Sequence, residues 1–230
     1  LDALISITMH RGAWEEFEQL VTEAHAHYVA LGDRAMEADA LCMLANTYVH
    51  RGRLQLGITR ARSALTISRE IRNAWGQINA LYDLTSGLLD SGSYTEALEI
   101  ALQAVASTRT LNIHSSRANT LLLRALIQLG GVYRAVQAGP AAREIDLEAL
   151  KLTEASESSS YTAIVASVLC ADSVLAGQWA DAQRYAQQAA TVASDHELLY
   201  VEIPHWRVTE ALLHGGDRTR GRGHSPRIKS

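Results

Sequence analysis

The sequence has 230 residues, of which 47% are hydrophobic and 20% charged, and its formal net charge at pH 7 is −4. This share of apolar residues is enough for a continuous core without disulfides or metal ions, and the mildly acidic balance does not favour a nucleic-acid-binding body. Only three prolines and one phenylalanine occur, a composition that favours helices over sheets.

No run of about 18 apolar residues occurs, so we expect no membrane span. The N-terminus enters an amphipathic pattern at once, which gives no sign of a signal peptide. The two cysteines, Cys42 and Cys170, fall at expected core positions of separate helices. We interpret them as buried free thiols in a reducing compartment, and therefore expect a cytoplasmic protein.

The chain opens with the short apolar stretch Leu1–His10 and continues into an expected helix over Trp14–Ala30. Gly32 is a natural helix stop, and Asp33 is a natural N-cap for the next helix. Because Leu1–His10 is too short for a complete first helix, we expect the chain to be a segment of a longer protein.

The stretch Leu81–Thr108 shows the helical hairpin from which the chain is built. Its leucines recur at three- and four-residue steps as far as Leu89, which indicates the apolar stripe of a helix. Gly92, between two serines, interrupts the stripe, since glycine tolerates the left-handed backbone that ends a helix. Small residues from Ala97 to Ala104 then mark a second helix that approaches the first closely.

The same hairpin returns at a nearly constant interval, with steps of 40, 40, 45 and 40 residues between its turns. The turn positions are Gly12, Gly52, Gly92, Gln137 and Gly177. Two residues later stand the groups that we expect to wedge between hairpins, Trp14, Leu54, Tyr94, Gly139 and Trp179. Five residues after the turns stand Phe17, Gly57, Ala97, Ala142 and Ala182. Twelve residues after them stand Ala24, Ala64, Ala104, Ala149 and Ala189.

The fourth repeat carries five extra residues, which predicts a longer first helix over 115–136. A second helix then starts near Gly139, with Pro140 in its first turn. The polar stretch Glu154–Ser160 predicts a loop before repeat five. A sixth repeat opens over Glu202–His214, but no second helix follows it.

We therefore divide the chain into a repeat domain over 1–216 and a basic tail over 217–230, which we expect to be disordered. The tail has five basic residues and one acidic residue, Asp217, so the acidic excess of the chain lies in the repeats.

These repeats resemble the tetratricopeptide repeat family. That family has a small residue late in the first helix, then an aromatic residue, a turn glycine and spaced alanines. The small residue is matched by Ala45, Thr85, Gly130 and Cys170, and the aromatic residue by Tyr48 and Tyr133, with departures at Leu88 and Ser173. The resemblance implies an all-α, right-handed superhelical solenoid of about five and a half stacked antiparallel hairpins. The 40-residue period is similar to that in repeat regions of MalT-type bacterial regulators and multidomain signalling ATPases.

In this family the first helices line a concave groove, which implies a partner-binding surface on them. The candidates are Asp39, Cys42, Met43, Asn46 and His50 in repeat two, and Asn79, Tyr82, Asp83, Ser86 and Asp90 in repeat three. Repeats four and six add Arg124, Gln128, Gly131, Arg134, Trp206, Arg207 and Glu210. We expect the groove to change from acidic in repeat three to basic in repeat four. The alternative is that these are solvated faces of amphipathic helices.

The sequence shows no catalytic constellation, and we expect neither an enzyme nor a cofactor. Glu23 and His27 share a helix face at the i, i+4 spacing that metal sites use, and His10 and His25 lie nearby, but two ligands do not make a metal site. No phosphate-binding glycine loop or nucleophile motif occurs.

Three functions remain open. The first is a non-catalytic protein-protein interaction scaffold that holds a peptide or helix in the groove, within a larger cytosolic regulatory or signalling protein. The second is a small-molecule-sensing repeat domain of a transcriptional regulator. The third is nucleic-acid binding through the tail, which we rank last. Self-association through the terminal repeats is also compatible with an array whose apolar ends are open.

Overall fold

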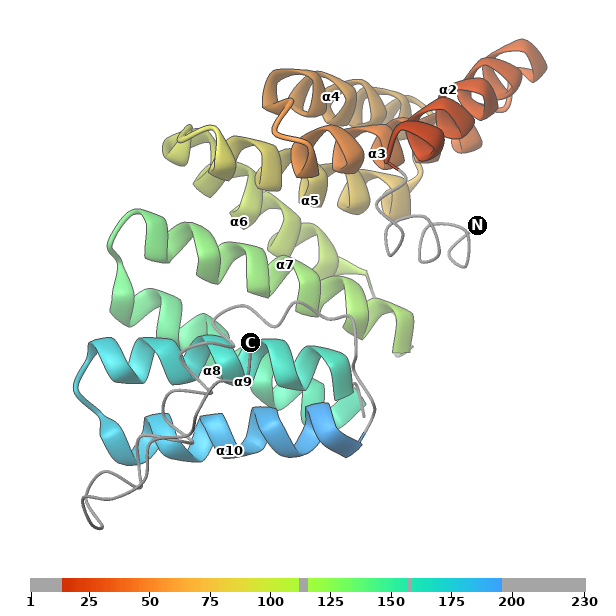
Figure 1. Ribbon diagram of the computed structural model, residues 1–230. Helices are drawn as coiled ribbons and strands as arrows, with labels where there is room; N and C mark the ends of the chain where they lie inside the picture. Colours follow the sequence, from red (N-terminus) through yellow and green to blue (C-terminus); the bar gives the residue numbers. More distant parts are fainter. Residues whose placement is uncertain (1–13, 112–115, 157–158, 196–230) are drawn as a thin grey trace, which may run out of the picture. The chain divides into compact units, whose positions relative to one another are not determined.

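The computed structural model describes residues 14–111, 116–156 and 159–195 (Figure 1). Within these ranges all regular structure is α-helical. The helices are α2 (Trp14–Leu31), α3 (Arg34–His50), α4 (Leu54–Glu70), α5 (Ala74–Asp90), α6 (Tyr94–Thr110), α7 (Ser116–Ala135), α8 (Gly139–Ser156), α9 (Ser159–Leu175) and α10 (Trp179–Asp195). The expected all-α fold of stacked antiparallel hairpins is confirmed. The extra residues of the fourth repeat lengthen α7 to 20 residues, against 17 in α3 and α5.

The chain divides into two compact units, and the division falls inside α8, between Ala149 and Leu150. In the first unit each helix from α2 to α7 packs against the next, and the first helices α3, α5 and α7 also pack side by side (Figure 1). In the second unit α9 and α10 pack against each other as a hairpin.

The turns between paired helices share one backbone conformation. Gly52, Gly92 and Gly177 have φ values of 71°, 77° and 69°, and Gln137 takes the same left-handed region at 60°. This conformation lets the amides after each helix reach back to carbonyls of its last turn, as Arg53 N does to Tyr48 O at 2.8 Å. Gln137 therefore occupies the glycine position at the cost of a side chain in a backbone region that favours glycine.

Small residues allow the two helices of a hairpin to approach closely. Ala64 and Ala149 are completely buried, and Ala104 is 2% exposed. Gly57 lies where α4 meets α3, because a methyl group there would stand 2.7 Å from Val49 Cγ2 and 3.0 Å from the carbonyl oxygen of Ala45. The alanine and glycine columns therefore hold the paired helices at short range.

Second helices are joined to one another by long charged side chains. Arg62 on α4 pairs with Glu96 on α6 at 2.7 Å, and Arg109 on α6 pairs with Glu148 on α8 at 2.6 Å. All four side chains are largely exposed, so each pair contributes little stability. Close helix packing across repeats in the first unit comes instead from each second helix against the following first helix, and from α3, α5 and α7 against one another.

Two expectations about local structure were wrong. Tyr94 and Trp179 are 42% and 62% exposed, so they do not wedge between hairpins. Each is the first residue of its helix, directly after the turn, where the chain has not yet entered the packed interface. The expected loop over Glu154–Ser160 is also shorter, because α8 continues through Ser156 and α9 begins at Ser159.

Both cysteines are free and buried, as expected. No helix in the described ranges combines the length and the apolarity that crossing a bilayer requires. The predicted boundary between repeats and tail at 216/217 lies outside the described residues.

Candidate functional site

Polar side chains of three successive first helices lie on one face of the first unit. They recur at steps of three or four residues, which places them on the same side of each helix. We call this set the α3–α5–α7 face, and it consists of Cys42, Asn46, Asn79, Tyr82, Asp83, Ser86, Arg124 and Gln128. Because α3 and α7 both pack against α5, the structure brings these predicted groove residues together.

Asp83 lies at the centre of the face and is only 5% exposed. Burial raises the pKa of its carboxyl group from 3.8 to about 7, against the opposing effects of Arg124 and of hydrogen bonds with the side chains of Cys42 and Asn46. The carboxyl group is thus shared between α5 and α3, and it titrates near neutral pH.

Cys42 is the partner of Asp83 on α3. Burial raises the pKa of this thiol well above its ordinary value, and the negative charges of Asp83 and Asp39 raise it further. A thiol with a raised pKa stays protonated at neutral pH and is a poor nucleophile. Cys42 therefore acts here as a hydrogen-bonding core residue.

Arg124 reaches from α7 to α5, where two residues orient its guanidinium group. Its Cζ lies 4.0 Å from the centre of the Tyr82 ring. One terminal nitrogen, Nη1, donates a hydrogen bond of 3.1 Å to Asn79 Oδ1. One turn further along α7, Gln128 Nε2 donates to the Ser86 hydroxyl group of α5. Two successive first helices are therefore joined on this face by cation–π and amide contacts.

Arg134 is directed elsewhere, because it pairs with Asp146 on α8. Asp146 is 2% exposed, and a methyl group on Gly130 would stand only 2.4 Å from its Oδ1. Gly130 thus makes room for a buried carboxylate that Arg134 neutralises. Arg134 therefore has a packing role between α7 and α8, and its contact with a partner in the groove stays a prediction. No pattern in the sequence pointed to Asp146.

The remaining candidates lie at the margin of the face or outside the described residues. His50 is exposed at the end of α3 and stacks on Trp14 of α2, with 5.9 Å between the ring centres. Asp90 is exposed at the end of α5. Trp206 and Arg207, predicted for the sixth repeat, lie outside the described residues, as does His10.

The expected change from acidic to basic along the groove stays a prediction, and it rests on fewer exposed charges than the sequence suggested. Its acidic side depended on Asp83 and Asp90, but Asp83 is buried beneath the surface and titrates near pH 7. Its basic side depended on Arg124 and Arg134, and Arg134 is engaged by Asp146. Among the described residues that make up the α3–α5–α7 face, Arg124 is the one with a cationic side chain.

A separate apolar hollow lies between α2 and α3, that is, between the first and second hairpins. Its cavity volume is about 70 Å³, and the lining residues are Phe17, Leu20, Val21, Ala24, Tyr28, Met36, Asp39, Ala40 and Met43. Asp39 is its only carboxyl group, beside the phenol of Tyr28. Burial raises the pKa of that carboxyl above 3.8, with a further contribution from Asp33.

The histidines of α2 do not assemble a metal site in the described part of the chain. Glu23 accepts a hydrogen bond of 3.0 Å from Gln19, and His27 is exposed. Across the described ranges, no three His, Cys, Asp or Glu side chains lie close enough together to hold one ion.

No protein-family model matches the sequence, and no curated protein matches it either. Solved structures do match. RapI in its apo form is 17% identical, with a TM-score of 0.70 over 94% of this chain and 81% of RapI. The Rap protein complexed with Competence and Sporulation Factor is 15% identical, with a TM-score of 0.66 over 91% of this chain and 62% of that protein. The chain thus spans about three fifths of that Rap protein.

TPR-like repeats of a kinesin light chain from Podosopora anserina are 16% identical, with a TM-score of 0.64 over 85% of this chain and 93% of theirs. At these identities the likeness concerns the fold alone. The helices, the repeated turns and these structural neighbours together show that the chain has a TPR-type helical-repeat fold.

Proposed function

We propose that the chain is a non-catalytic scaffold that binds a partner peptide or helix on the α3–α5–α7 face. One observation carries the proposal: three repeats place amide, hydroxyl and guanidinium groups on one face and orient them by contacts with one another. Side chains held in place before binding lose less conformational entropy when a partner arrives.

The chemistry of the face suits a polypeptide. Asn46, Asn79 and Gln128 supply amide groups, which can both donate to and accept from a peptide backbone. Tyr82 supplies an aromatic surface, and aromatic residues contribute strongly to protein interfaces. The Rap protein among the structural neighbours was crystallised in complex with Competence and Sporulation Factor, which supports the use of this fold for binding another molecule.

The finer parts of the proposal rest on the resemblance in the sequence. We propose that the chain works within a larger cytosolic regulatory or signalling protein, of the kind represented by MalT-type regulators and multidomain ATPases. The raised pKa of the Cys42 thiol supports a role without covalent catalysis.

Photo-crosslinking tests the proposed surface. Tyr82 is replaced by p-azidophenylalanine, which keeps an aromatic ring beside Arg124, and the variant is expressed and illuminated in its host cells. The matched control carries the same replacement at Tyr94, which is 42% exposed at the start of the second helix α6. We expect a defined protein adduct from position 82 and none from position 94. Adducts of equal yield from both positions, or from position 94 alone, would contradict the proposal.

The apolar hollow between α2 and α3 supports a second candidate function, the sensing of a small molecule between hairpins. Its lining is apolar apart from Asp39 and the hydroxyl group of Tyr28, so it suits a small apolar ligand with one hydrogen-bond donor or positive charge. A ligand at 100 times its dissociation constant adds about 2.7 kcal/mol of stability. A thermal-shift screen should therefore find ligands whose effect is lost in Ala40→Trp, which fills the hollow. If no compound in a metabolite panel shifts the melting temperature, the scaffold is the one candidate function that is left.

A further inference from the structure

Arg124 keeps most of its hydrogen-bonding capacity. A guanidinium group carries five N–H donors, and in the described residues one terminal nitrogen of Arg124 donates to Asn79. The described carboxylates form no ion pair with Arg124 within 4 Å. Its Cζ lies over the Tyr82 ring, 4.0 Å from the ring centre. The group is therefore oriented, positively charged and able to donate to an additional acceptor.

Asp83 lies close enough to act on Arg124 electrostatically, but its hydrogen bonds run to Cys42 and Asn46 on α3. Its carboxyl group is buried, whereas Arg124 is partly exposed on the face. An incoming anion would thus meet Arg124 from the solvent side while Asp83 stays behind the surface. Two carboxylates near one cation repel each other, so a bound anion favours the protonated form of Asp83.

We propose that Arg124 receives the carboxylate of an acidic side chain in the partner segment, and that binding is coupled to the uptake of a proton by Asp83. The inference rests on the proposed function of the α3–α5–α7 face. Arginine pairs with a carboxylate through two parallel hydrogen bonds, which fixes both the position and the orientation of the partner.

The surroundings of Asp83 make its carboxyl group the one that takes up a proton when the partner's carboxylate binds. From α3 it meets the Cys42 thiol and the Asn46 amide, and from α7 the charge of Arg124. Asp39, on the same helix as Cys42, acts on that thiol. On α4 and α6, which also pack against α5, Arg62 and Glu96 pair with each other.

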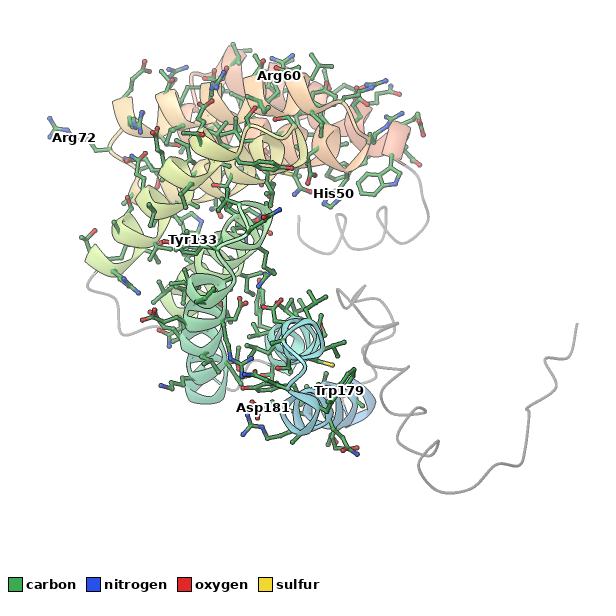
Figure 2. All side chains as sticks on the ribbon, turned by 90° about the vertical axis from the view of Figure 1, so that its left-hand side faces the viewer. His50, Arg60, Arg72, Tyr133, Trp179 and Asp181 are labelled. Carbon is green, nitrogen blue, oxygen red and sulfur yellow. The ribbon has the colours of Figure 1, made fainter. Side chains whose placement is uncertain are left out.

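Two further cations of these helices, Arg109 on α6 and Arg60 on α4, are placed as follows. Arg109 pairs with Glu148, and Figure 2 shows Arg60 projecting from the side of the unit opposite to His50. Arg60 therefore provides a matched arginine control on the outer side.

Selection from a phage-displayed library of random peptides tests the anchor. The full chain and the variants Arg124→Gln and Arg60→Gln are immobilised at about pH 6, after circular dichroism has checked their helix content. We expect peptides enriched in Asp and Glu from the wild type and from Arg60→Gln, and their binding to Arg124→Gln should be weaker by about tenfold or more. An acidic preference that survives in Arg124→Gln overturns the anchor.

Isothermal titration of a selected acidic peptide tests the proton coupling on the unaltered protein. Near pH 7, the heat of binding should differ between buffers of different ionisation enthalpy by the amount that proton uptake predicts. From about pH 6 to about pH 8 the affinity should fall by about fivefold, a large part of the tenfold that a coupling of one pKa unit gives over the whole titration range. In Asp83→Asn both effects should disappear. Identical proton uptake in the wild type and in Asp83→Asn overturns the coupling.

The outcomes separate this inference from the proposed function. Some peptides could bind without any acidic preference and still protect Tyr82→p-azidophenylalanine from crosslinking. Such a result overturns the role of Arg124 as the anchor but leaves the proposed α3–α5–α7 binding face intact. Peptides selected equally by all variants, with no effect on that crosslink, contradict the binding face itself.

Discussion

The guanidinium group of Arg124 on α7 lies over the ring of Tyr82 on α5, with 4.0 Å between Cζ and the ring centre. This contact joins successive repeats on the face that carries the polar cluster. A cation held over an aromatic ring at a partly exposed site contributes about 0.5–1 kcal/mol. The same residue pair thus stabilises the stack of hairpins and orients the cation that we assign to a partner.

A double-mutant cycle measures this contact. Tyr82→Leu and Arg124→Gln, alone and combined, should give a coupling free energy of about 0.5–1 kcal/mol in chemical denaturation. Tyr82→Phe should behave like the wild type, because it keeps the ring. A coupling near zero would mean that the two groups do not interact in solution.

Replacing Asp83 by Asn should change how stability depends on pH. The pKa of Asp83 is raised from 3.8 to about 7 in the folded chain. The folded state therefore binds more protons than the unfolded state between these values, and the contribution of Asp83 to stability falls as pH rises from about 4 to 7. Asp83→Asn should remove that fall, which is on the order of 3 kcal/mol.

The measurement is the free energy of unfolding at several pH values for the wild type, Asp83→Asn and the control Asp90→Asn. Asp90 is exposed, so its variant should follow the wild type. If the wild type instead gained stability relative to Asp83→Asn as pH rose through this window, the buried carboxyl group would have to be ionised and favourably paired.

Adjacent glycines on α7 should respond to alanine with opposite signs. At Gly130 a methyl group would stand 2.4 Å from Asp146 Oδ1, whereas at Gly131 the nearest atom, Leu89 Cδ2, is 3.6 Å away. Gly131→Ala should stabilise the chain by up to about 1 kcal/mol through helix propensity. Gly130→Ala should destabilise it by about 1–3 kcal/mol, as measured by urea denaturation. Equal effects would contradict the close packing of Asp146 against α7.

Replacing Gln137 by glycine should make the folded chain more stable. Its φ is 60°, in the region where Gly52 and Gly92 lie in the equivalent turns. Gln137→Gly should stabilise the chain by about 1 kcal/mol, and Gly92→Ala should destabilise it by a similar amount. Thermal unfolding of the two variants checks this pair, and a loss of stability in Gln137→Gly would contradict the equivalence of the turns.

The fold follows from the sequence because its determinants are local and repeated. Gly52 and Gly92 mark turns of the same conformation, and the alanine column that includes Ala64 and Ala104 marks the helix–helix contacts. The register of the repeat alone identified Gln137 as a turn position, because its residue type does not indicate a turn. A period of 40 residues therefore carries most of the information about the architecture.

The site was predictable only in part. Register placed Asn79, Tyr82 and Arg124 on first helices, but the depth of a side chain depends on how neighbouring helices pack, so the burial of Asp83 could not be anticipated. The ion pair of Arg134 with Asp146 was also hidden, because it joins a first helix to the following second helix. The absence of a side chain at Gly130 makes that pair possible, and the spacing of charges does not show it.

The most direct test of the account is hydrogen exchange, measured by mass spectrometry with and without an excess of a library-selected peptide. A partner on the α3–α5–α7 face should slow exchange in segments 42–50, 79–90 and 124–135, and leave the second helices α4 and α6 unchanged. Protection confined to α4 and α6, or no protection anywhere in the first unit, would contradict the central claim that the first helices form the binding surface.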